Sequence, residues 1–342
     1  MKKIWLFIIS LVVGTVLFFW VLKIVGWQEI KNALLIFTGW KGFVIILLTF
    51  FMSLIGTWKW KEILKGEDVK ISFRDLFGPY LAGYTLMLLA PVILWGGEIL
   101  RGYFLKKKNS INWSKSMASV IIDRIFEWTA NLVIIILGIC FFLSKICLIP
   151  KNLEFAFGAL FLFFSAVVIY FYSKVFRKKS LIKSLARIFG LRNIEEKSTL
   201  LETEKEIFVF FNLKNKFMWR SLGLSFVRAA VMLARVWFVL FFLQKTISLP
   251  QSLSILGFNY MAVMIPIPAA LGSHEAIQTL AFSGLGLGTS NATAFTMIIR
   301  AAEIIFSFTG LVILFKLGVE FAKKLLFRES GKIVDDSKKN GK

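Results

Sequence analysis

Cysteine and histidine are nearly absent from this sequence. Its 342 residues include 2 Cys and 1 His. The cysteines, Cys140 and Cys147, are too few for a disulfide framework and do not have metal-ligand spacing. With His274 as the single histidine, the ligands of a catalytic zinc ion are missing as well. We therefore expect no metal and no cofactor.

The sequence also lacks the motif of an ATP-driven transporter and the room for a soluble catalytic domain. No phosphate-binding loop of the G-x-x-x-x-G-K-S/T kind occurs. The one sizeable polar segment, Ser173–Arg220, has mixed charge and intermittent apolar residues. This pattern predicts an amphipathic helix lying on the inner leaflet. The residues from 328 to 342 are rich in Lys, Asp, Ser and Gly and are expected to form a disordered cytoplasmic tail.

Acidic residues are in short supply, with 20 Asp and Glu against 42 Lys and Arg and a net charge of +22. Such a surplus is compatible with nucleic-acid binding, but 57% of the residues are hydrophobic and the mean hydropathy is +0.74. These values are typical of a polytopic membrane protein. Basic clusters beside membrane spans attract anionic lipid headgroups. We expect anionic inner-leaflet lipids as partners, and no nucleic acid.

Long apolar runs predict the architecture. Six runs are long enough to cross a bilayer: Ile4–Leu22, Gly42–Trp58, Met117–Leu143, Leu153–Tyr172, Ser221–Leu243 and Ala292–Phe315. Two more, Leu76–Leu105 and Leu253–Leu287, are interrupted by Pro and Gly, and such breaks must be buried in protein or line a cavity. The sequence therefore predicts an all-α polytopic membrane protein with about six full transmembrane helices and two re-entrant broken-helix hairpins.

The distribution of basic residues predicts the orientation. With the N-terminus inside and the two broken regions treated as hairpins, most Lys and Arg fall on the inner side. If the first broken region crossed the membrane fully, Lys106, Lys107 and Lys108 would face outward. We therefore expect a multi-pass protein of the cytoplasmic membrane with both termini in the cytoplasm.

One segment occurs twice. The first copy contains Pro91, Glu98, Arg124 and Glu127, and the second contains Pro268, Glu275, Arg300 and Glu303. The Pro-to-Glu and Arg-to-Glu offsets are the same in both copies. Since three full spans separate the hairpins, the second copy is expected to be inverted, as in secondary transporters whose sites lie at the repeat interface. We expect one integral membrane domain over 1–327, with repeat 1 at about 42–143, a linker at 173–220 and repeat 2 at about 221–316.

The glutamates that follow each break are expected in the first turn of a short second limb. There the free N–H groups and the positive end of the helix dipole favour the carboxylates of Glu98 and Glu275. Two interpretations stay open: each Glu only caps its half-helix, or it also contributes to a binding site.

The Arg and Glu of each later pair lie three residues apart, so both side chains share one helical face. Arg124/Glu127 and Arg300/Glu303 are then either ion pairs that fix helix packing or the lining of a polar cavity shared by the repeats. An ionisable residue within a membrane span is a functional candidate by default.

Four further ionisable residues lie in or beside the apolar segments. Asp123 has no counterpart in the second copy and is expected to serve protonation or to pair with Arg228 or Arg235. Arg235 lies deeper in its span and is the better candidate for a lipid phosphate, because guanidinium matches phosphate oxygens. His274 is either a proton carrier or a hydrogen-bonded structural residue.

Two stretches carry a family resemblance. These are LLAPVILWGGEILRGYFL with SVIIDRIFEW, and MIPIPAALGSHEAIQTLAF with MIIRAAEII. They resemble the membrane region of lysylphosphatidylglycerol synthases, the flippase-like domain of the multiple peptide resistance factor and its stand-alone relatives, over roughly residues 4 to 320. The resemblance implies lipid flipping, or a place in lipid-linked sugar or other polar-lipid pathways. The soluble synthase domain is absent from this sequence, so lipid aminoacylation is not expected.

Three functions remain as hypotheses. The first is a flippase that moves a polar phospholipid or a lipid-linked sugar across the cytoplasmic membrane. The second is a membrane enzyme of the glycosyltransferase type, and the third is a non-catalytic subunit that partners a lipid-modifying enzyme. The first is preferred, with no catalytic residues. The expected substrate-binding residues are Glu98, Arg124, Glu127, Arg235, Glu275, Arg300 and Glu303, with Asp123 and His274 for proton coupling.

Overall fold

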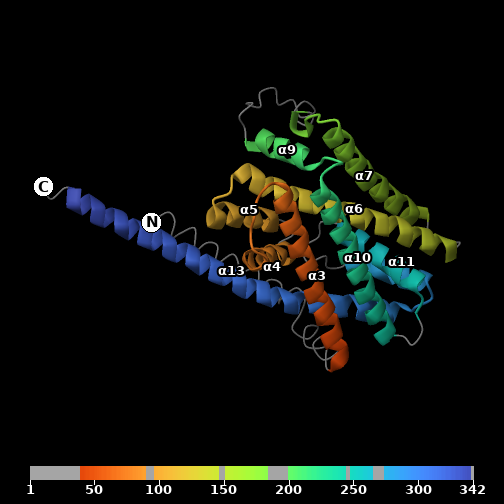
Figure 1. Cartoon of the computed structure of the whole chain (residues 1–342). Helices are drawn as coiled ribbons and strands as arrows, with labels where there is room; N and C mark the ends of the chain where they lie inside the picture. The colour runs from red at the N-terminus through yellow and green to blue at the C-terminus, as the bar shows by residue number, and fades with distance from the viewer. Residues whose placement is uncertain are drawn as a thin grey trace.

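Helices form every regular element in the part of the chain that the structure describes. The computed structural model describes residues 39–89, 96–145, 151–183, 199–243, 247–264 and 273–339. The helices are α3 (Trp40–Gly66), α4 (Phe73–Leu89), α5 (Gly96–Asn109), α6 (Trp113–Lys145), α7 (Lys151–Phe176), α9 (Thr199–Phe210), α10 (Lys216–Leu243), α11 (Leu249–Met264), α12 (Ser273–Gly284) and α13 (Thr289–Lys339) (Figure 1). The predicted all-α class is confirmed.

Four helices are long and apolar enough to cross a membrane: α3, α10, Trp113–Ser144 within α6 and Asn291–Lys316 within α13. They coincide with four of the spans expected from the apolar runs. A fifth expected span, Leu153–Tyr172, falls within α7. The first, Ile4–Leu22, lies outside the described residues.

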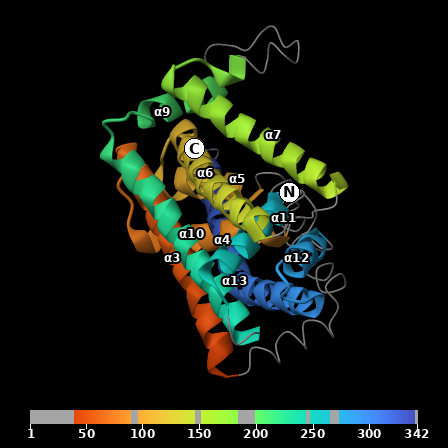
Figure 2. The ribbon, with the colours of Figure 1, turned by 90° about the vertical axis from the view of Figure 1, so that its right-hand side faces the viewer.

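Helices α3 and α10 pack along each other and lie side by side in both views (Figures 1 and 2). Both helices bury small residues where they pack, among them Ser53 in α3 and Ser225 in α10. Small side chains allow close backbone approach where apolar burial gives no driving force in lipid. The hydroxyls of Thr49 and Thr57 donate to carbonyls one turn back at 2.8 Å, so their polar atoms are satisfied within the helix.

Each broken region contributes two packed helices. Helices α4 and α5 meet at a pair of glycines, where a Cβ placed on Gly97 would lie 2.2 Å from the Gly83 carbonyl oxygen. Helices α11 and α12 are joined by a hydrogen bond from Gln278 Nε2 to the Ile255 carbonyl, at 3.3 Å. The connections that contain Pro91 and Pro268 lie outside the described residues.

The first limb of each hairpin packs on the long helix of the other repeat. Helix α4 contacts α13, where Thr85 Oγ1 donates to the Ser307 carbonyl at 3.2 Å. Helix α11 contacts α6, where the Phe142 and Phe258 rings meet edge to face at 4.6 Å. Each crossing is also marked by a glycine, Gly310 in the first and Gly138 in the second. The two repeats therefore interlock reciprocally.

The linker between the repeats folds onto the bundle through α9. Phe210 and Phe211 contact Phe126 of α6, with ring centroids 6.1 and 5.4 Å apart. Phe171 of α7 joins the same cluster, and α7 and α9 lie together at one edge of the molecule (Figure 2). Helix α9 packs on α6 and α7, and the placement of this segment on the inner leaflet stays a prediction.

Helix α13 continues to Lys339, where the composition predicted a disordered tail from residue 328. Extending a helix that is already formed requires little further ordering per residue, which explains why polar residues can continue it.

Candidate functional site

Repeat 1 assembles a chain of charged side chains around Arg124. Arg124 Nη1 lies 2.9 Å from Glu127 Oε2, one turn along α6, as the i, i+3 spacing predicted. Its Nε also donates to Glu98, in the first turn of α5. The guanidinium therefore holds the hairpin limb against α6, and Glu98 does more than cap its own helix.

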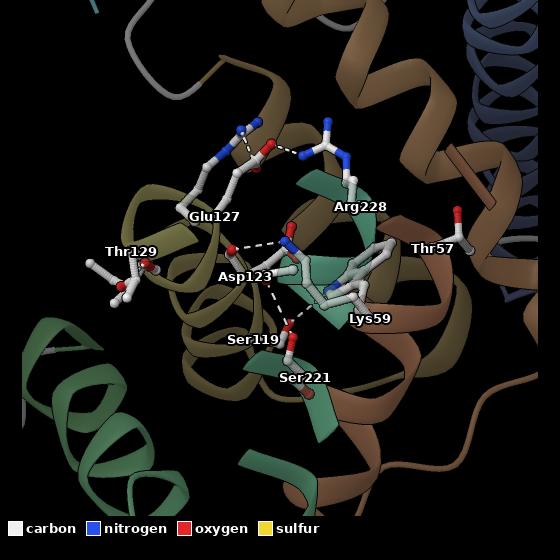
Figure 3. Close-up of polar contacts among 12 residues, drawn as sticks. Thr57, Lys59, Ser119, Asp123, Glu127, Thr129, Ser221 and Arg228 are labelled. Carbon is white, nitrogen blue, oxygen red and sulfur yellow. Dashed lines mark hydrogen bonds and ion pairs between the residues drawn. The ribbon is translucent and has the colours of Figure 1, made fainter. Parts of the chain in front are cut away.

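Helix α10 reaches the same carboxylate from the other side. Arg228 Nη1 donates to Glu127 Oε1, so the two Glu127 oxygens bind two different guanidiniums. Figure 3 shows the Arg228 and Glu127 side chains pointing toward each other. The sequence suggested Arg228 only as a partner of Asp123 and did not identify it as a site residue.

Repeat 2 has the corresponding contacts with one difference. Arg300 Nη1 pairs with Glu275 Oε1 at 2.8 Å, which repeats the Arg124–Glu98 contact. Glu303 Oε1 instead receives Arg235 Nη2 at 2.9 Å, while Arg235 Nη1 donates to Thr49 Oγ1 at 3.1 Å. The sequence predicted an Arg300–Glu303 pair, but the spacing only makes that pair sterically available, and each residue has a partner on another helix.

Asp123 occupies a separate buried site beside this chain. Its carboxylate lies 2.8 Å from Lys59 Nζ of α3 (Figure 3) and 2.8 Å from Arg101 Nη1 of α5. The expected partners Arg228 and Arg235 both bind glutamates instead. The pairing predicted for Asp123 is thus corrected: it ties α3 and α5 to α6.

Arg101 is also held by aromatic rings. Its guanidinium carbon lies 4.1 Å from the centroid of Trp60 and 4.9 Å from that of Tyr80. The attraction between a cation and an aromatic face is strengthened when both are desolvated. Lys59 and Arg101 were both missed in the sequence, although Arg101 stands three residues after the repeat glutamate Glu98.

The charged groups differ in accessibility. Arg235 is fully buried, with 0% of its side chain exposed, so it positions Glu303 and is closed to a ligand in this conformation. Arg124 and Arg228 are exposed by 14% and 16%, and Arg300 by 16%. His274 lies in the first turn of α12 beside Glu275, and the described residues give it no hydrogen bond. The groups open to a polar ligand are thus the two repeat arginines and Arg228, with Glu127, Glu275 and Glu303, whereas Glu98 is buried.

The charged groups of the site are held in ion pairs. A guanidinium bound by carboxylates stays charged in a low-dielectric surrounding, and the charge of each pair is balanced by its partner. Within the described residues, His, Cys, Asp and Glu form no group of three that would hold a metal. Fixed charges of both signs at this depth are suited to replacing the hydration of a polar headgroup.

Comparison with known proteins identifies the family. The model of the lysylphosphatidylglycerol synthase transmembrane region matches residues 7–310. A UPF0104 membrane protein of Pyrococcus horikoshii is 26% identical over 321 residues, covering 88% of this chain and 92% of the relative. Another, of Methanocaldococcus jannaschii, is 24% identical over 273 residues, covering 76% and 79%. No solved structure matches the chain. The chain therefore belongs to the family of lysylphosphatidylglycerol synthase transmembrane regions.

Proposed function

We propose that this protein translocates the headgroup of a polar lipid, a phospholipid or a lipid-linked sugar, between the leaflets of the cytoplasmic membrane. The observation that carries the proposal is the pair of matching ion-pair networks, Glu98–Arg124 and Glu275–Arg300, one in each repeat. The first network is connected to α10 through Glu127 and Arg228. In the second repeat α10 contributes Arg235, which binds Glu303, three residues after Arg300. Isolated packing pairs would not require this correspondence.

The headgroup enters laterally between the repeats while its hydrocarbon tail stays in the bilayer. Partly exposed guanidiniums and carboxylates, Arg124, Glu127 and Arg300 among them, replace the water that the headgroup loses. Arg235 is fully buried and supports the site from behind by fixing Glu303. Proton coupling is assigned to His274, because Asp123 is held by two cations.

The interlocked packing supplies a route for alternation. Each hairpin limb rests on the long helix of the other repeat at a glycine contact, Gly310 for α4 and Gly138 for α11. Small residues at helix crossings allow helices to slide past each other with little steric resistance. The two hairpins open to opposite sides in turn.

The test is lipid exchange in liposomes. Purified protein is reconstituted with a fluorescent phospholipid or a fluorescent lipid-linked sugar, and chemical quenching from outside reports how much probe is exposed over time. We expect exchange above that of protein-free vesicles, and slower exchange for the folded double variant Arg124→Gln, Arg300→Gln. Absence of exchange for every polar lipid, or full exchange by that variant, would refute the proposal.

The proposed orientation places both termini and the segment 173–220 in the cytoplasm. Cysteines introduced at Lys107, Lys178 and Lys338 would then react with an impermeant thiol reagent only after the membrane is opened. Labelling of the Lys107 position from outside would contradict the inverted arrangement of the repeats.

A further inference from the structure

The charges of repeat 1 do not balance. Its ion pairs form two groups: Lys59 and Arg101 on Asp123, and Arg124 and Arg228 on Glu98 and Glu127. Together they contain four cations and three carboxylates. The two groups adjoin, because Asp123 and Arg124 are consecutive residues of α6. One positive charge among these described residues therefore has no carboxylate to oppose it.

Repeat 2 is balanced by comparison. Arg235 and Arg300 face Glu303 and Glu275. The position three residues after its repeat glutamate is Gln278, and the one before its repeat arginine is Ile299. The Arg101–Asp123 pair of repeat 1 is thus replaced by two uncharged buried residues, and repeat 2 has no counterpart of Lys59 among its ion pairs in the described residues.

Repeat 1 also contains buried guanidinium donors that have no acceptor, three against the one, Arg235 Nε, of repeat 2 in the described residues. Nε and Nη2 of Arg101, whose side chain is 3% exposed, make no hydrogen bond, nor does the buried Nε of Arg228. Leaving such donors unpaired away from water is costly. An anion beside Arg228 offsets the surplus charge, and the unused Nε is a further donor on the same guanidinium.

We infer that repeat 1 binds the phosphate of a lipid with one net negative charge, between Arg124 and Arg228. Glu127 now bridges these guanidiniums with its two oxygens, and a phosphodiester has two free oxygens with the same capacity. The phosphate takes the bridging position of Glu127, while the positive charge held at Lys59 and Arg101 stabilises the added anion. This inference rests on the proposed function and narrows its substrate class.

Lipid binding is measured by native mass spectrometry of the full chain released from an uncharged detergent. The probes are dioleoylphosphatidylglycerol, which carries one negative charge, and monoglucosyl dioleoylglycerol, which has no phosphate. We expect the phosphatidylglycerol to bind about tenfold more tightly than the glucolipid. This ratio corresponds to the free energy of one charge-assisted hydrogen bond. Excess inorganic phosphate should not compete. If inorganic phosphate does displace the lipid, the site recognises free phosphate and the lipid assignment is overturned.

Two variants locate the site. The neutral double change Glu127→Gln, Arg228→Gln removes the bridge and should abolish the preference for the phosphate lipid. Lys59→Met removes the surplus without touching the ligand, and Asp123 keeps Arg101 as its partner. It should weaken phosphatidylglycerol binding several-fold and leave the glucolipid unchanged. The matched control is Glu62→Gln, Lys65→Gln, which removes another α3 ion pair at 2.6 Å, at the end of the helix.

The outcomes separate this inference from the proposed function. The phosphate site is refuted if the control and the Glu127→Gln, Arg228→Gln variant prefer the phosphate lipid equally. It is also refuted if the wild type shows no preference for that lipid. If vesicles that contain the protein still exchange the glucolipid in that case, the proposed translocation stands without the phosphate site. Phosphate-lipid binding that depends on Arg228 and Lys59, in vesicles without any lipid exchange, supports the site and refutes the translocator.

Discussion

Arg101 and Asp123 form a buried ion pair, with Arg101 Nη1 2.8 Å from Asp123 Oδ2, at positions that are Gln278 and Ile299 in the second repeat. Both members of the pair are therefore absent together from repeat 2. Because an unpaired buried charge is far more costly than an uncharged pair, the two changes are compatible only in combination. This pair makes the two halves of the protein electrostatically different.

Asp123→Asn is expected to be strongly destabilising. It leaves Lys59 and Arg101 buried without an opposing carboxylate, at a cost of roughly 3–5 kcal/mol for a broken buried pair. Folded yield in detergent, measured by size-exclusion chromatography, should fall sharply. Adding Lys59→Met should recover part of the yield, because only Arg101 then remains unpaired and Trp60 and Tyr80 still cover it. An Asp123→Asn protein with wild-type yield would contradict the assignment.

Arg300→Ala is expected to be rescued by a change at Glu275. The structure pairs Arg300 with Glu275 at 2.8 Å and pairs Glu303 with Arg235 at 2.9 Å. Adding Glu275→Gln should therefore restore folded yield, whereas adding Glu303→Gln should lower it further because Arg235 loses its carboxylate. Rescue by Glu303→Gln alone would favour the pair that the helical spacing predicted.

Gly138→Ala should loosen the crossing of α6 and α11. The added Cβ would lie 2.7 Å from the Leu253 carbonyl oxygen, so the helices must separate. Gly223→Ala on α10 is the control, since nothing lies within 4 Å of its added Cβ. Alanine in a helix interior is favoured over glycine by roughly 0.5–1 kcal/mol, so the control should raise the thermal midpoint slightly while Gly138→Ala lowers it. Equal midpoints would contradict the close contact.

Glu67, at the end of α3, should make stability depend on pH. Burial raises the pKa of its carboxyl well above 4.5, and Glu206 raises it further while Lys115 lowers it. As pH rises above the usual range, the unfolded chain releases its proton first, so stability falls until the raised pKa is passed. Glu67→Gln should give a higher thermal midpoint near pH 8 and a flatter profile between pH 5 and 8. A wild-type midpoint that rises over this range would refute the shift.

Much of the fold follows from hydropathy. The apolar runs at Gly42–Trp58 and Ser221–Leu243 are long enough that burial in lipid decides their conformation. The contact of Phe210 in α9 with Phe126 could not be predicted, because an amphipathic pattern is the same whether its apolar face meets lipid or protein. The helical continuation to Lys339 was not predicted, because the amino-acid composition of residues 328–342 contains no information about the helix that precedes them.

The site was predictable in residue type and only partly in pairing. The repeat identified Glu98, Arg124, Glu275 and Arg300, since charges within apolar runs stand out in a sequence. The partners of these residues on other helices could not be identified in this way, because their positions depend on how α3 and α10 pack. Lys59 was overlooked because it directly follows an apolar run and was taken to mark the end of a span. In the structure it is buried against Asp123.

The central claim is that lipid crosses as the interlocked hairpins move, and a reversible lock tests it most directly. A Cβ on Gly78 of α4 lies 3.4 Å from Ile313 Cγ2 of α13, so Gly78→Cys and Ile313→Cys can be joined by oxidation once Cys140 and Cys147 are replaced by Ser. Leaflet exchange in liposomes is then followed before oxidation, after it and after reduction. We predict exchange that stops on locking and returns on reduction. Exchange at one unchanged rate in all three states would contradict the account.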